Sequence, residues 1–154
     1  MPVAGASDAE RSPGELPIAI LVLATVCALA ACGTISAMRP TVLIVDDHAA
    51  FRASARALLE AEGFDVVGEA TDGAEAVAAV AVLRPEIVLL DIQLPDLDGL
   101  AVAEQLAAAP DPPAVVLISS RDAAAYGPRL QATPVRGFIP KSRLSGEALA
   151  ALAG

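Results

Sequence analysis

Tryptophan is absent from the sequence, and only 3% of its 154 residues are aromatic. The 55% hydrophobic content must therefore come mainly from Ala, Val, Leu and Ile, whose small side chains suit close packing of helices on a sheet. Basic residues are also few, with 10 Lys and Arg against 19 Asp and Glu and a net charge of −9. Since no basic stripe is available to neutralise phosphates, the composition excludes a general affinity for nucleic acids and disfavours DNA binding.

Cysteine is absent from Met38 to the last residue. The two cysteines, Cys27 and Cys32, lie in an apolar N-terminal stretch, and their spacing matches neither a zinc pair nor a Cys-x-x-Cys redox pair. This distribution suits a reducing compartment. The length of 154 residues suits one domain with enough chain to bury a core.

The N-terminal part of the chain differs in composition from the rest. Residues 1–15 are small, polar and acidic and are predicted to be disordered, whereas residues 16–38 carry no charge and are long enough to cross a hydrocarbon core of about 30 Å. Three interpretations stay open. The apolar segment is a signal sequence with Cys32 as a lipid attachment point, or it is a membrane anchor, or Met38 is the true start and residues 1–37 do not belong to the product.

We therefore expect two parts, a leading segment of residues 1–37 and a domain of residues 38–154. The membrane is a partner only if residues 16–38 form a real anchor, in which case the basic flank after this segment predicts that the domain lies at the cytoplasmic face of the inner membrane. Under the third interpretation the domain is cytoplasmic.

From Met38 onward, apolar runs alternate five times with helical patterns. Such alternation predicts an α/β fold, a doubly wound five-stranded parallel sheet with helices on both faces. The fourth helix is predicted to be weak or kinked, because Gly127 and Pro128 interrupt it. The predicted strands are 41–45, 64–67, 87–90, 115–118 and 135–139, and the predicted helices are 49–62, 71–83, 100–108, 122–131 and 144–152.

Three of these strands are followed directly by polar residues, which are Asp46 and Asp47, Asp91, and Ser119. The last strand is followed by Pro140 and Lys141. If the strand order is the flavodoxin-like 2-1-3-4-5, the first and third strands are neighbours and three carboxylates meet in one pocket. Three carboxylates that lie so near one another cannot all remain ionised without a cation. A ligand set made only of oxygen atoms suits Mg²⁺ better than zinc. A lysine and a hydroxyl beside them suit phosphate oxygens.

Each of these residues alone has an ordinary structural explanation. Asp46 and Asp47 can cap a helix and supply its acidic first turn, Asp91 and Ser119 can cap strand exits, and Lys141 can be a solvated lysine. Their joint placement at successive strand ends favours a functional site.

Four motifs give the chain a close resemblance to a known family. They are Val-Asp-Asp after the first strand, Leu-Leu-Asp-Ile-Gln-Leu-Pro-Asp-Leu-Asp-Gly around Asp91, Leu-Ile-Ser after the fourth strand, and Gly-Phe-Ile-Pro-Lys. Over about residues 41–152 the sequence resembles the receiver domain of bacterial two-component response regulators, in particular the receiver half of LuxR/NarL-type regulators. The resemblance implies that Asp91 is the phosphoacceptor and that Lys141 contacts the phosphoryl group.

The same resemblance implies the remaining site residues. Asp46 and Asp47, together with Asp91 and the backbone carbonyl of Gln93, would hold Mg²⁺. The other two site residues, Ser119 and Phe138, would form the switch pair, in which the hydroxyl turns toward the phosphate and the ring turns inward. In this family the positions of Gln93 and Arg121 tune the phosphoryl lifetime, which the sequence therefore does not predict.

As a function, the resemblance implies a stand-alone receiver that takes a phosphoryl group from a sensor histidine kinase or a phosphotransfer protein. It would take part in its own phosphorylation and dephosphorylation without being a turnover enzyme. Output would pass through protein contacts of residues 123–152, with an unknown output protein or a second copy of the chain. No DNA-binding domain is expected, because the chain ends directly after the last predicted helix.

The alternative is a membrane-tethered or soluble receiver-like interaction module that acts without phosphorylation. A hydrolase of the haloacid dehalogenase type would require a second aspartate where Gln93 stands, which excludes it. We interpret Asp96 and Asp98 as turn residues, because no complete EF-hand loop is present, and His48 as a loop residue beside the acidic pair.

Overall fold

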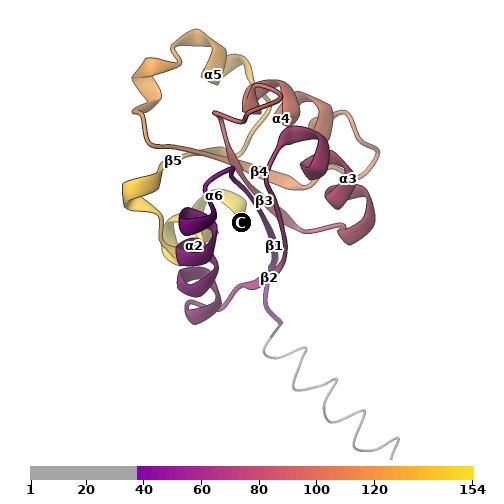
Figure 1. Cartoon of the computed structure of the whole chain (residues 1–154), viewed down its shortest axis with the longest axis vertical. Coiled ribbons are helices and arrows are strands. Elements are labelled where there is room, and N and C mark those ends of the chain that lie inside the picture. The colour runs from indigo at the N-terminus through magenta and orange to yellow at the C-terminus, as the bar shows by residue number, and fades with distance from the viewer. Residues whose placement is uncertain (1–37) are drawn as a thin grey trace, which may run out of the picture. The chain divides into compact units, whose positions relative to one another are not determined.

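The computed structural model describes residues 38–154, in which strands and helices alternate along the chain (Figure 1). Five strands form one sheet, all neighbouring pairs are parallel, and the order is β2-β1-β3-β4-β5, which confirms the predicted flavodoxin-like fold. The elements are β1 (Thr41–Val45), α2 (Ala49–Ala61), β2 (Asp65–Ala70), α3 (Gly73–Leu83), β3 (Ile87–Asp91), α4 (Gly99–Ala107), β4 (Ala114–Ser119), η1 (Ala123–Ala125), α5 (Pro128–Ala132), β5 (Gly137–Pro140), η2 (Lys141–Arg143) and α6 (Gly146–Ala153).

The predictions for the N-terminal segment fall outside the described residues. Residues 1–37 hold both cysteines and nearly all of the predicted apolar segment. Among residues 38–154, no helix combines the length and the apolar character that a membrane span requires.

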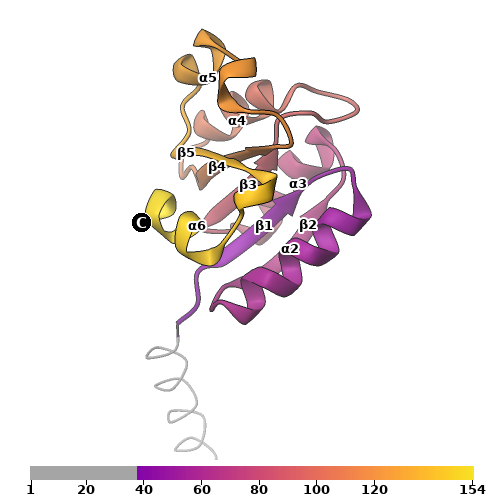
Figure 2. The same ribbon diagram turned by 90° about the vertical axis from the view of Figure 1, so that its left-hand side faces the viewer.

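The core consists of two apolar layers, one on each face of the sheet. Successive side chains of a strand point to opposite faces, so the central strands β1 and β3 supply residues to both layers. In Figures 1 and 2, α2 and α6 cover one face while α3 and α4 cover the other. The layer beneath α3 and α4 includes Leu43, Val45, Leu90 and Leu117, and the layer beneath α2 and α6 includes Ile44, Leu89, Val116 and Ile118.

Short polar side chains begin three of the helices. Asp72 accepts a hydrogen bond from the backbone N–H of Glu75 at the start of α3, and Ser145 accepts one from Ala148 at the start of α6. A side-chain oxygen at this position satisfies one of the N–H groups that a helix leaves unpaired at its beginning. Asp98 does the same for α4, which also places it at the end of the loop that follows β3.

Two strand boundaries differ from the predicted ones by more than one residue. Strand β2 continues to Ala70, beyond the predicted end at residue 67, because its last residues stay paired with Leu43–Val45 past an irregularity in the register. Strand β5 begins at Gly137 and not at residue 135. In both cases tertiary pairing, which has no local signal, decides where the strand begins or ends.

The predicted interruption of the fourth helix is confirmed. The segment forms a three-residue turn of 3₁₀ helix, η1, and then a separate five-residue helix, α5, with Pro128 at its first position. Gly127 between them has φ 57° and ψ −140°, a conformation that L side chains rarely adopt. Proline lacks a backbone N–H and is tolerated at the first turn of a helix, so α5 starts there and does not continue η1.

Candidate functional site

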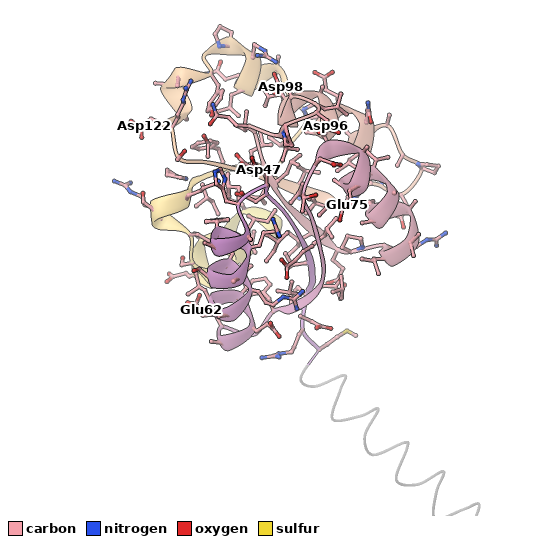
Figure 3. The ribbon with its side chains drawn as sticks, viewed as in Figure 1. Asp47, Glu62, Glu75, Asp96, Asp98 and Asp122 are labelled. Carbon is pink, nitrogen blue, oxygen red and sulfur yellow. The ribbon has the colours of Figure 1, made fainter. Side chains whose placement is uncertain are left out.

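Carboxylates from two neighbouring strands meet at the carboxyl-terminal edge of the sheet. Asp46 follows β1 and is fully buried, and Asp91 is the last residue of β3 with 2% of its surface exposed. Since β1 and β3 pair directly, the two side chains emerge side by side. Asp47 lies at the same edge, and Figure 3 shows it toward the same end of the sheet as Asp96 and Asp98.

Lys141 joins this group from the end of β5. Its Nζ lies 2.5 Å from Asp46 Oδ2 and 3.1 Å from Asp91 Oδ2. The ammonium also lies 4.7 Å from the centre of the Phe51 ring, so an aromatic face on α2 borders it. The structure thus brings together four of the predicted site residues, Asp46, Asp47, Asp91 and Lys141, which are separated by up to 95 positions in the sequence (141 − 46).

Burial and charge oppose each other at Asp91. Burial raises the pKa of its carboxyl above the ordinary value, and the nearby Asp46 carboxylate adds to this rise. The backbone N–H of Gln93, which donates to Asp91 Oδ1 over 3.1 Å, and the Lys141 ammonium act in the opposite direction. The result is a carboxylate more basic than an exposed aspartate.

Lys141 shows the complementary effect. Burial by itself would lower the pKa of its ammonium, but the Asp46 and Asp91 carboxylates outweigh burial and raise the pKa above the ordinary value. Lys141 is therefore held charged beside the two carboxylates, and it is the only lysine of the chain.

The loop after β1 is fastened to α2 and β2. Arg52 donates to the carbonyl oxygen of Asp46 over 2.7 Å and forms an ion pair with Glu69 at 2.9 Å. A second ion pair joins Glu69 to Arg56 at 2.8 Å, and the hydrogen bond from Arg56 is the main cause that lowers the pKa of Glu69. These contacts hold the backbone of Asp46 independently of its side chain.

The loop after β3 is fastened at both of its aspartates. Asp96 accepts hydrogen bonds from the backbone N–H groups of Gly73 and Ala74 at the start of α3, which lower its pKa. The next aspartate, Asp98, caps α4 and forms an ion pair with Arg129 of α5. The bonds from the N–H groups of Leu97 to Asp96 and of Leu100 to Asp98 are the local contacts expected of turn residues, whereas the bonds of Asp96 to the start of α3 are long-range contacts that this interpretation did not include.

Glycine is required where this loop enters α4. A Cβ on Gly99 would lie 2.2 Å from the carbonyl oxygen of Asp91 and 2.6 Å from Cα of Ile92, so no side chain fits. The N–H of Gly99 donates to the carbonyl oxygen of Ile92 over 2.7 Å. The backbone thus folds closely behind Asp91.

Ser119 ends β4 beside Asp91 and is fully buried, yet among the described residues its hydrogen bonds join it to neither Asp91 nor Lys141. The hydroxyl accepts from the backbone N–H of Arg121 over 3.0 Å and lies 2.5 Å from the hydroxyl of Tyr126. The Tyr126 ring packs against Phe138 with 6.3 Å between ring centres and 55° between planes.

Tyr126 is the residue of this region that the sequence reasoning missed. It lies in the turn between η1 and α5, seven positions after Ser119. Its status as the only tyrosine of the chain was the one available signal, and nothing in the local pattern indicated which group its hydroxyl would reach.

Two residues beside the acidic pair remain exposed. Gln93 lies beyond Asp91 with its side chain at the surface and its backbone N–H on the Asp91 carboxylate. His48 is 70% exposed, and its Nδ1 lies 3.2 Å from Asp46 Oδ1 and 2.9 Å from Asp47 Oδ1. The predicted position of His48, in the loop beside the acidic pair, agrees with this placement.

The donor set fits a hard divalent cation. One ligand atom from each of Asp46, Asp47, His48 and Asp91 lies within 4.8 Å of the others. Asp46 Oδ2 is buried and forms no hydrogen bond within residues 38–154, although Lys141 Nζ is close to it. A buried carboxylate whose Oδ2 has only the Lys141 ammonium beside it, next to two further carboxylates, suits Mg²⁺, which prefers oxygen ligands and uses few of them from the protein.

Comparison with known proteins identifies the class. The family model of the response regulator receiver domain matches residues 42–153, and the chain belongs to this family. A putative transcriptional regulator of Pseudomonas aeruginosa is 39% identical over 110 residues, which cover 71% of this chain and 53% of that protein. The transcriptional regulatory protein PdtaR of Mycobacterium tuberculosis is 33% identical over 113 residues, covering 68% of this chain and 55% of its own length.

A solved structure agrees with this assignment. The signal receiver domain of the putative response regulator NarL from Mycobacterium tuberculosis is similar with a TM-score of 0.68 and 33% identity, over 75% of this chain and 96% of that one. The chain spans about half the length of the curated relatives it matches. It is therefore a receiver of the two-component type, similar to the LuxR/NarL branch.

Proposed function

We propose that this receiver is the phosphoacceptor of a two-component phosphorelay and that Asp91 takes the phosphoryl group. The observation that carries this proposal is the placement of Asp91. Its carboxylate is buried at the end of β3, made more basic by burial, and paired with the Lys141 ammonium beside two further carboxylates. Pairs of titratable groups with shifted pKa values at a sheet edge are typical of functional sites.

The reaction requires little covalent chemistry from the protein. A carboxylate oxygen of Asp91 attacks the phosphorus atom of a phosphohistidine in line with the leaving group, the new P–O bond forms as the P–N bond breaks, and the imidazole leaves. The N–H of Gln93 holds Asp91 Oδ1 and so orients the carboxylate. Lys141, 3.1 Å from Asp91 Oδ2, supplies a charge that can move from the carboxylate to a phosphoryl oxygen.

Mg²⁺ is the proposed cofactor. Asp46, Asp47 and Asp91 would hold it together with the backbone carbonyl of Gln93. When bound, it would neutralise negative charge on the oxygens of the transferring phosphoryl group. The contacts of Arg52 with the carbonyl of Asp46 and with Glu69 keep the first of these ligands in place.

The proposed partners follow from the same chemistry. The donor is a sensor histidine kinase or a phosphotransfer protein, and the output passes through protein contacts of residues 123–152 with another protein or a second copy of the chain. We propose further that residues 38–154 act as one unit in the cytoplasm, separate from residues 1–37.

The test is the intact mass of the full chain after incubation with acetyl phosphate, with Mg²⁺ and with EDTA. Wild type should gain one phosphoryl group only in the presence of Mg²⁺. Asp91→Asn should gain none, because an amide cannot accept the group, and Asp46→Asn and Lys141→Met should gain much less. Glu104→Gln, an exposed change on α4, is the matched control and should behave as wild type.

Two outcomes would overturn the proposal. A gain of mass in Asp91→Asn would move the acceptor to another residue. No gain in folded wild type, from acetyl phosphate or from a panel of histidine kinases, would favour the receiver-like interaction module that acts without phosphorylation.

A further inference from the structure

The hydroxyl of Ser119 is already engaged where it stands. Its Oγ accepts the N–H of Arg121 and lies 2.5 Å from the hydroxyl of Tyr126, and Ser119 itself is fully buried. If Ser119 donates to Tyr126, it has no hydrogen left for another acceptor, because a serine hydroxyl carries a single hydrogen. If Tyr126 donates, Oγ accepts two hydrogen bonds, which fix its position. In this second case Ser119 keeps its own hydrogen, but in both cases Oγ can rotate toward Asp91 only by leaving the hydroxyl of Tyr126.

Tyr126 is partly buried and packs against apolar side chains. Its ring packs against Phe138, and it lies against the apolar layer beneath α3 and α4. Directly after it, Gly127 turns the chain into α5, and Arg129 of α5 pairs with Asp98 of the loop that follows β3. The phenol is therefore not a free surface group that can simply follow the serine.

The position of Ser119 makes this contact relevant to the acceptor. Ser119 follows Ile118, whose strand partner is Asp91, and pairs across to Pro140, which precedes Lys141. The serine thus lies between the acceptor and the lysine at the edge of the sheet, while its hydroxyl is bound on the side of Tyr126.

We infer that Tyr126 is a positioning residue that withholds the Ser119 hydroxyl from a phosphoryl group on Asp91 and thereby sets how stable the phosphorylated state is. This inference rests on the proposed function, since it concerns the same site. For Ser119 to bind the phosphoryl group, the Ser119–Tyr126 hydrogen bond must break. The loss of this hydrogen bond disfavours the phosphorylated state of Asp91. A buried hydrogen bond of this kind corresponds to a factor of about 2 to 10 in an equilibrium constant.

Beryllofluoride, a mimic of the aspartyl phosphoryl group, gives an equilibrium test on the full chain with Mg²⁺. Its affinity, read from the bound signal in fluorine NMR, should be about 2- to 10-fold higher for Tyr126→Phe than for wild type, because the change removes only the hydroxyl. Ser119→Ala should bind more weakly. In the Ser119→Ala background, Tyr126→Phe should have no effect, since Tyr126 acts through Ser119.

Thr133→Val is the matched control for loss of a hydroxyl from the same segment. Thr133 is buried at the end of α5, and its Oγ1 donates to the carbonyl oxygen of Arg129 over 2.7 Å. This hydrogen bond does not involve Ser119. The affinity of the Thr133→Val variant for beryllofluoride should equal that of wild type. An increase as large as that of Tyr126→Phe would show that loosening of the segment, and not release of Ser119, is the cause.

The protein also provides its own spectroscopic reporter. Because the chain has one tyrosine and no tryptophan, its tyrosine fluorescence comes from Tyr126 alone. Beryllofluoride should change the emission of wild type, as the phenol loses its partner, and should leave the emission of Ser119→Ala unchanged.

The outcomes separate the two proposals. If wild type binds no beryllofluoride in an Asp91-dependent manner, the proposed function fails. If wild type binds it while Tyr126→Phe has the same affinity and the tyrosine emission stays constant, the phosphoacceptor stands and the role of Tyr126 is refuted.

Discussion

The two halves of the receiver are built differently. The first half, β1 to α4, has helices of 13, 11 and 9 residues, and its loops are fastened by the Arg52–Glu69 pair and by Asp96. The second half, β4 to α6, has two 3₁₀ turns of three residues, a five-residue α5 and an eight-residue α6 (Figure 1). The first half holds all three carboxylates of the site, and the second holds Ser119, Tyr126 and Lys141.

Under the proposed function, this division separates groups that stay in place from groups that move. Ligands of a cation need fixed backbones, and long packed helices provide them. The proposed movement of the Ser119 hydroxyl and the Lys141 ammonium toward a phosphoryl group would need neighbouring elements that rearrange at low cost, and short helices with few buried residues lie at the low-stability end of a structure. No residue of α5 is buried.

The largest expected effect comes from comparing one leucine of a long helix in the first half with one of a short helix in the second. Leu59→Ala in α2, where the side chain is fully buried, should lower the free energy of unfolding by about 2–5 kcal/mol. Leu130→Ala in α5, where the side chain is only half-buried, should cost about 1 kcal/mol. Urea denaturation of both variants measures the difference. Equal losses of unfolding free energy would contradict the view that the first half is more rigid than the second.

The second prediction concerns the effect of the buried Asp91 carboxylate on the free energy of unfolding. Asp91→Asn should raise the free energy of unfolding by about 0.5–2 kcal/mol near neutral pH, since the site holds a carboxylate whose charged form is disfavoured by burial. The pKa of Asp91 is raised on folding, so wild type loses stability as the pH rises from the unfolded pKa through the folded one.

The stability difference between Asp91→Asn and wild type should therefore widen as the pH is raised from about 4 toward 7, in denaturation curves collected without Mg²⁺. Glu104→Gln serves again as the control and should show no such trend. A difference that narrows over this range would mean that Lys141, and not burial, dominates the energetics of Asp91.

The smallest expected effect is that of the exposed ion pair between Arg129 of the second half and Asp98 of the first. Arg129→Ala removes the contact with Asp98, but Arg129 is 65% exposed, so the loss of stability should be below about 1 kcal/mol and should shrink at high salt. Hydrogen exchange should show faster opening of α5 and little change in α2. Arg136→Ala, an exposed arginine without an ion pair in the described part of the chain, is the control.

The sequence predicted the sheet well because each buried strand has a local signal. Runs such as Ile87–Leu90 are apolar without interruption, and a run of this kind, bounded by Pro85 and Asp91, is typical of a strand covered on both faces. The interruption of the fourth helix was equally readable, because the backbone limits of Gly127 and Pro128 belong to the residues themselves.

The contacts of individual side chains were harder to predict from the sequence. The end of β2 at Ala70 depends on pairing with β1, and the contact of Asp96 with the start of α3 joins two loops that are 22 or 23 positions apart. Tyr126 was overlooked because an irregular segment has no periodicity that tells which way a side chain points.

The order of apolar and polar residues along the chain was enough to determine the α/β alternation, the strand ends with Asp46, Asp91, Ser119 and Lys141, and the resemblance to receivers. Local chemistry and periodicity carry that information. Only the tertiary structure decided that Lys141 lies 2.5 Å from Asp46 and that Tyr126 binds Ser119, because such distances depend on how whole elements pack against one another.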